Sequence, residues 1–81
     1  MVTGKKGITP AELIERLEKR NGVITQIERD TARGGSDVNG ATIYDSYYTT
    51  TEGSRLHICH AEGLVRYYAL TDRHGNTTSN I

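Results

Sequence analysis

The sequence has no Phe, no Trp, one Cys and one Pro among its 81 residues, and its formal net charge is zero. Only 35% of the residues are hydrophobic, so the core of any fold must be small. Disorder by composition usually combines low hydrophobicity with high net charge, and the second condition is missing here. Balanced charge also argues against strong non-specific attraction to nucleic acid or to an anionic membrane. We therefore expect a compact fold with a small core.

The single cysteine, Cys59, excludes an intrachain disulfide, whereas small exported domains with weak cores are usually rich in disulfides. Residues 1–7 lack the apolar stretch of a secretory signal, and no apolar run approaches the roughly 20 residues that a membrane helix needs. We expect a cytoplasmic protein that contacts no membrane. The length allows one domain, which we place at residues 8–71, between a flexible N-terminal arm (1–7) and a frayed C-terminal tail (72–81).

The clearest local signal is the start of a helix. Thr9 suits the N-cap, Pro10 suits the first helical position, and Glu12 completes a capping box three residues after the cap. Gly22 supplies a residue that ends many helices, so we expect a helix over residues 10–20. Its apolar stripe, at helical spacing, consists of Leu13, Ile14 and Leu17.

Residues 23–30 are rich in β-branched side chains, which favours a strand. A second helix is the competing interpretation, because Ile24 and Ile27 are also helically spaced, and two helices joined at Gly22 would form a helix-turn-helix. Residues 32–40 are turn formers almost throughout, which indicates a mobile loop.

Three further strands are predicted at regular spacing, over residues 42–50, 55–61 and 64–71. Short turns at 52–53 and 62–63 separate them, which is typical of a β-meander. The fold class that follows is α+β, with the N-terminal helix packed on a four-stranded antiparallel sheet in two layers. If the strand 42–50 lay at an edge, it could pair with a second copy and give a homodimer.

The two short turns fix a register, and the register fixes which side chains share a face. Tyr48 would lie opposite His57, and His57 opposite Tyr68. The face towards the helix would then hold Ile43, Tyr47, Leu56, Ile58, Val65, Tyr67 and Ala69. Cys59 would join the opposite, exposed face. One extra residue in the 51–54 turn would exchange the faces of the strand 42–50 and expose Tyr47 in place of Tyr44 and Tyr48.

The exposed face is the candidate partner-binding surface, and its predicted residues are Tyr44, Tyr48, Arg55, His57, Arg66 and Tyr68. Tyr and Arg are enriched at binding hot spots because they bury much area at a small entropic cost. This surface suggests a small non-enzymatic module that binds a larger protein or nucleoprotein complex and inhibits or regulates it, by analogy with the small inhibitors carried by mobile elements. The competing interpretation is that cross-strand aromatic pairs only stabilise the sheet.

Nucleic-acid binding is the alternative function. The tyrosines could stack bases while Arg55, Arg66 and the Lys5 and Lys6 arm contact phosphates, as on sheets that bind single strands. If residues 23–33 were helical, a helix-turn-helix that binds double-stranded DNA would become the favoured form.

Catalytic and metal chemistry have weak signals. His57, Cys59 and His60 are close in sequence, but on a strand His60 points away from the other two, so His74 and Asp72 would be needed to complete a tetrahedral site. No phosphate-loop or dinucleotide motif is present, and a flat sheet of this size leaves no room for a pocket of roughly 300 Å³. We expect no metal, no cofactor and no enzymatic activity.

Overall fold

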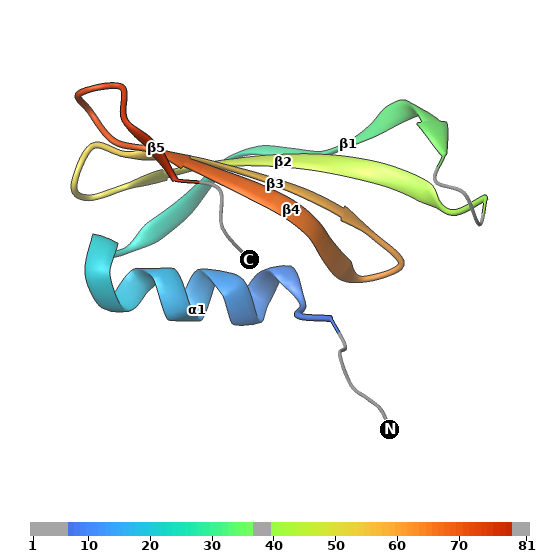
Figure 1. Ribbon diagram of the computed structural model, residues 1–81, viewed down its shortest axis with the longest axis horizontal. Coiled ribbons are helices and arrows are strands. Elements are labelled where there is room, and N and C mark those ends of the chain that lie inside the picture. The colour runs from blue at the N-terminus through green and yellow to red at the C-terminus, as the bar shows by residue number, and fades with distance from the viewer. Residues whose placement is uncertain (1–6, 37–39, 79–81) are drawn as a thin grey trace.

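The computed structural model describes residues 7–36 and 40–78, with Arg29 through its backbone alone. One helix, α1 (Pro10–Asn21), lies across one face of an antiparallel sheet in the order β1-β2-β3-β4-β5 (Figure 1). The strands are β1 (Ile24–Ser36), β2 (Thr42–Thr50), β3 (Arg55–Ala61), β4 (Leu64–Thr71) and β5 (Thr77–Thr78). The predicted two-layer α+β architecture is confirmed, but within the described residues the sheet has five strands and not four. Among the described residues, no helical segment combines the length and the apolar character of a membrane span.

The capping box forms as the sequence predicts. Glu12 N donates to Thr9 Oγ1 at 3.2 Å, and Thr9 N donates to Glu12 Oε1 at 3.0 Å. Gly22 follows the helix with a φ of +76°, and a Cβ there would collide with the Thr51 hydroxyl, so glycine is required on two grounds. The helix predicted over 10–20 is therefore confirmed to within one residue.

The strand predicted over 23–30 is confirmed, and it excludes both the second helix and the helix-turn-helix. The mobile loop predicted from residue 32 is wrong as far as Ser36, because β1 continues alongside β2 to a pairing of Ser36 with Thr42. Register shifts along this pair absorb the turn-forming residues, including Gly34 and Gly35. β2 lies between β1 and β3, so it offers no edge for the predicted pairing with a second copy.

β5 arises from the segment expected to be a frayed tail. The Asp72 carboxylate accepts hydrogen bonds from His74 N at 2.8 Å and Asn76 N at 2.9 Å, and this side-chain turn reverses the chain. Thr77 and Thr78 then pair with the end of β4. Three predicted segments lie outside the described residues: the remainder of the tail (79–81), the arm up to residue 6, which contains Lys5 and Lys6, and loop residues 37–39.

The core fills the space between α1 and the sheet. Its buried cluster contains Leu13, Ile24, Tyr48, Leu56, Ile58, Val65 and Tyr68. Leu56 and Ile58 are almost fully buried, at 1% and 0% exposure. Ile8, Ile14, Leu17 and Leu70 pack around this cluster. The prediction that the helix stripe covers Leu56, Ile58 and Val65 is confirmed, but the other four residues predicted for this face, Ile43, Tyr47, Tyr67 and Ala69, lie on the opposite face of the sheet.

The predicted register of β2 against β3 is wrong by one residue. Thr50 and Ser54 close a three-residue loop, because Thr50 N donates to Ser54 O and Ser54 N donates to Thr50 Oγ1, both at 3.0 Å. Tyr47 therefore lies opposite His57, and Tyr48 opposite Leu56. This is the one-residue change that exchanges the two faces of β2.

The register of β4 is shifted by a β-bulge. The two-residue turn forms as predicted, with Ala61 opposite Leu64, but a register shift between His60 and Cys59 places His60 opposite Val65 and Cys59 opposite Tyr67, so that Arg66 lies in the bulge. As a result Ile58 lies opposite Tyr68 and His57 opposite Ala69. Tyr68 thereby faces the helix, and Tyr67 turns to the other side of the sheet.

Candidate functional site

Six residues were predicted to share one binding face, and the structure divides them. Tyr48 and Tyr68 are buried core residues, each 7% exposed, and Tyr44 lies on the same face of the sheet as they do. Arg66 is exposed in the bulge, 3.7 Å from Glu62. Only Arg55 and His57 lie together on the face opposite α1, which we call the open face. The six residues therefore do not share one exposed face, contrary to the prediction from the sequence.

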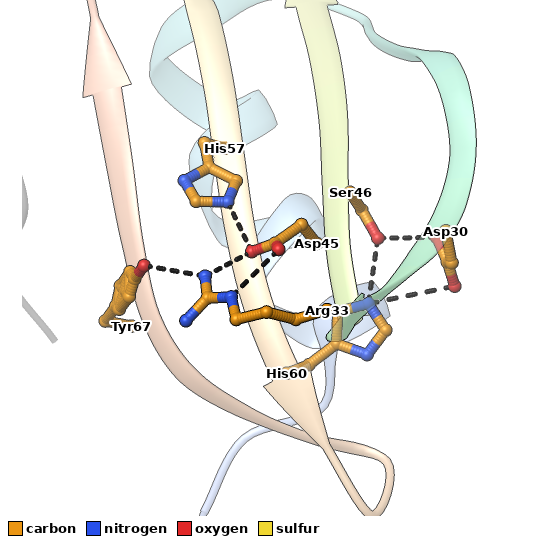
Figure 2. A network of polar contacts seen from close by, with 7 residues as sticks. All are labelled: Asp30, Arg33, Asp45, Ser46, His57, His60 and Tyr67. Atoms are coloured by element: carbon orange, nitrogen blue, oxygen red, sulfur yellow. Dashed lines mark hydrogen bonds and ion pairs between the residues drawn. The ribbon is translucent and has the colours of Figure 1, made fainter. Parts of the chain in front are cut away.

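The open face is organised around Asp45, a residue that no sequence pattern identified as part of the site. Its carboxylate accepts two hydrogen bonds from Arg33, from Nη2 at 2.6 Å and from Nε at 3.1 Å. His57 Nε2 lies 2.8 Å from the same carboxylate (Figure 2). A planar guanidinium matches a carboxylate in this two-point geometry, which fixes both side chains. Asp45 therefore joins β1, β2 and β3 through side chains.

Two tyrosines complete this arrangement. The Tyr47 ring stacks on the His57 ring with centroids 4.8 Å apart and an interplanar angle of 11°, and Tyr67 meets the His57 ring edge-on at 5.7 Å. Arg33 Nη2 also donates to the Tyr67 hydroxyl at 3.1 Å, as Figure 2 shows. We call Tyr47, His57 and Tyr67 the aromatic cluster. Tyr47 and Tyr67 are 39% and 42% exposed, so the cluster presents ring surface to solvent.

Charge on this part of the open face is largely compensated. Hydrogen bonds from Arg33 hold the pKa of Asp45 below its usual value, with a smaller contribution from His57 and against the opposing effect of burial. The same contact raises the pKa of Arg33. Arg33 therefore holds Asp45 in position. Its charge is compensated by the Asp45 carboxylate and is not available to bind phosphate.

Next to the aromatic cluster the open face is hollowed, with a volume of about 300 Å³. The prediction that such a small domain has no room for a hollow of this size is therefore wrong. The lining comes from β1 to β4 and consists of Ile27, Glu28, Tyr47, Tyr48, Arg55, Leu56, His57, Ala69 and Thr71. Of the predicted site residues on this face, Arg55 and His57 both border the hollow.

A second polar cluster, on the sheet face towards α1, combines Ser46, His60 and Asp30 (Figure 2). Ser46 Oγ donates to Asp30 Oδ1 at 2.5 Å and lies 2.8 Å from His60 Nε2. Because the hydroxyl has one proton, His60 Nε2 must be the donor in the second contact. A serine nucleophile needs an accessible oxygen and a base that takes its proton, and Ser46 is fully buried and gives its proton to Asp30. The cluster is therefore a hydrogen-bonded network in which Ser46 and His60 are buried and Asp30 is half exposed, and this arrangement does not match a catalytic triad.

The histidines and the thiol do not assemble into a metal site. His57 and His60 lie on opposite faces, as expected from strand alternation, and each is hydrogen-bonded across the sheet. Cys59 shares the face of His57 but is only 3% exposed. Across residues 7–36 and 40–78 there is no group of three or more His, Cys, Asp or Glu side chains that could hold a metal ion.

Comparison with known proteins gives no independent indication of function, since no protein-family model, curated protein or solved structure matches the chain. A function must therefore be inferred from the geometry of the open face itself.

Proposed function

We propose that the chain is a small non-enzymatic interaction module that binds a larger protein or nucleoprotein complex through its open face and thereby inhibits or regulates it. The observation that supports this most directly is the aromatic cluster. Tyr47 and Tyr67 are large, exposed and held in place by contacts that exist without a partner.

Such a cluster has the properties of a binding hot spot. Tyr buries a large rigid surface and loses little conformational freedom on binding. Here much of that freedom is already lost, because Tyr47 is stacked on His57 and Tyr67 is held by Arg33. Ordering side chains costs about 0.5 to 1.5 kcal/mol each during association, so prior ordering favours binding.

The same face supports nucleic-acid binding less well. Base stacking on Tyr47 and Tyr67 would need several nearby cations for the phosphates. Arg33 is paired with Asp45 and Arg66 lies 3.7 Å from Glu62, so Arg55 is the one predicted phosphate contact within the described residues that makes no ion pair there. The net charge of the chain is zero. Single-strand binding on the sheet therefore remains the second candidate.

A cytoplasmic location suits this module. Cys59 is a free thiol, buried at 3% exposure, and it needs no oxidising compartment. The analogy with small inhibitors carried by mobile elements rests on size and surface type alone.

The experiment is affinity capture from a nuclease-treated lysate of the source cells, followed by binding measurements with the purified partner. A Tyr47→Ala, Tyr67→Ala double variant should lose at least about tenfold in affinity, since hot-spot truncations cost about 2 kcal/mol or more. Tyr44→Ala is the matched control, because Tyr44 is equally exposed, at 38%, but lies on the other face. Loss of all captured protein on nuclease digestion, with affinity falling steeply as salt rises, would favour the nucleic-acid alternative.

A further inference from the structure

The hollow on the open face has the size of one large side chain. It opens where a small residue, Ala69, stands opposite His57 in the ladder and beside the longer side chain of Arg55. Its volume of about 300 Å³ lies at the lower limit for small-molecule sites. A dinucleotide or a similarly extended cofactor would exceed it, whereas one aromatic side chain would fill most of it.

The walls of the hollow favour an aromatic occupant. The stacked rings of Tyr47 and His57 form one wall, and Ile27, which is 52% exposed, contributes apolar surface from β1. Aromatic rings gain affinity beyond that from their buried area when they meet another ring edge-on or offset. The wall keeps its shape without an occupant, because Asp45 holds His57 at 2.8 Å.

Two charged side chains that line the hollow, Arg55 and Glu28, form no ion pair within the described residues. Within the described residues, the side chain of Arg55 makes no ion pair and no hydrogen bond, in contrast to Arg33, which is paired with Asp45. Glu28, also without such a contact among those residues, lies on β1, two strands away from Arg55. Strand spacing separates their backbones by roughly 10 Å. The hollow therefore has a free cation at one end and a free anion at the other.

We infer that this hollow receives an aromatic side chain of the partner protein and that Arg55 binds a carboxylate on the residue next to it. The guanidinium offers two parallel donors that match a carboxylate. Glu28 repels a second carboxylate at the far end and so sets the direction of the segment. The inference rests on the proposed function, since it specifies the chemistry of the partner at the open face.

The test uses acetylated dipeptide amides as probes of the hollow, titrated into the ¹⁵N-labelled full chain and followed by NMR. Glu-Trp should shift the backbone amides of Arg55, His57 and Ala69. It should bind at least about tenfold more tightly than Lys-Trp, which carries the opposite charge, and than Glu-Ala, which lacks the ring. Equal affinity for Glu-Trp and Lys-Trp, or shifts confined to another face, would overturn the inference.

Variants locate the effect. Arg55→Gln should weaken Glu-Trp binding about tenfold, and Ala69→Leu should abolish it by filling the hollow. Glu28→Gln is the matched control, because it removes the other free charge and should leave affinity equal or higher. Thermal unfolding of each variant confirms that the fold is intact.

The outcomes also separate this inference from the proposed function. If Glu-Trp fails to bind while the Tyr47→Ala, Tyr67→Ala variant loses the partner protein, the hollow inference is wrong and the open face remains the interface. If Glu-Trp binds as expected while that variant keeps full affinity for the partner, the hollow is a peptide site but the proposed interface is wrong.

Discussion

Adjacent tyrosines on β4 should respond very differently to removal. Tyr68 is 7% exposed and belongs to the core cluster, whereas Tyr67 is 42% exposed on the open face. The bulge in β4 is the cause of this difference, because it determines which of the two rings faces the helix. Tyr68→Ala and Tyr67→Ala therefore test the register directly.

The expected magnitudes differ severalfold. Truncation of a buried aromatic residue typically costs about 3 to 5 kcal/mol, from lost transfer free energy and the cavity left behind. Domains of this size have a free energy of unfolding of about 4 to 12 kcal/mol, so Tyr68→Ala removes a large part of it. Tyr67→Ala loses one exposed hydrogen bond from Arg33 and half-exposed ring contacts, which corresponds to about 1 kcal/mol or less.

Urea unfolding followed by circular dichroism measures both values. If Tyr68→Ala does not fold, Tyr68→Leu provides a smaller perturbation, still expected to exceed the effect of Tyr67→Ala. Equal destabilisation by the two alanine variants, or a larger effect at Tyr67, would refute the register and with it the assignment of the open face.

Three further outcomes follow from the contacts. The pKa of Asp45 is lowered in the folded state. The contribution of this carboxylate to stability is therefore complete above its unfolded pKa of about 3.9 and is lost as the pH falls through its folded pKa. Asp45→Asn should reduce the loss of folding stability that urea unfolding measures between about pH 5 and pH 2. Thr9→Ala removes the helix N-cap and should cost about 1 kcal/mol, measured by the same unfolding at neutral pH, and an unchanged midpoint would contradict the capping box. Ser46→Ala removes the hydroxyl that accepts from His60 Nε2 and leaves that nitrogen 3.7 Å from Asp30 Oδ2, beyond hydrogen-bond distance, so it should cost about 1 to 3 kcal/mol; a neutral effect would show that His60 does not depend on the hydroxyl.

Much of the fold could be predicted because its signals are local. Thr9, Pro10 and Glu12 specify the start of the helix through contacts within four residues, and the structure contains the predicted capping box. β-branched residues and glycine turns likewise located four of the strands. The fifth strand was missed because it has no apolar pattern and depends on the Asp72 side chain, which turns the chain back towards β4.

The faces of the sheet could not be predicted with the same success, because they depend on single-residue choices. Thr50 bonds to Ser54 and adds one residue to the turn, which exposes Tyr47, and the bulge at Arg66 exposes Tyr67. The alternative considered from the sequence, one extra residue in the 51–54 turn, matches the observed exposure of Tyr47. Nothing in the pattern signals the exposure of Tyr67, since a bulge reflects tertiary packing.

Arg33 was missed for a related reason. It precedes two glycines, Gly34 and Gly35, and the segment has the composition of a loop. In the structure it belongs to a strand, where its side chain reaches Asp45. Only the pairing of β1 with β2 brings these two residues together, so no local rule identifies the pair.

The most direct test of the open face as the binding surface is the affinity of the purified partner for three forms of the chain. We predict that the wild type and Tyr44→Ala bind equally and that the Tyr47→Ala, Tyr67→Ala variant binds at least about tenfold more weakly while it still unfolds cooperatively. Full affinity in the double variant, or a loss of affinity confined to Tyr44→Ala, would contradict the account.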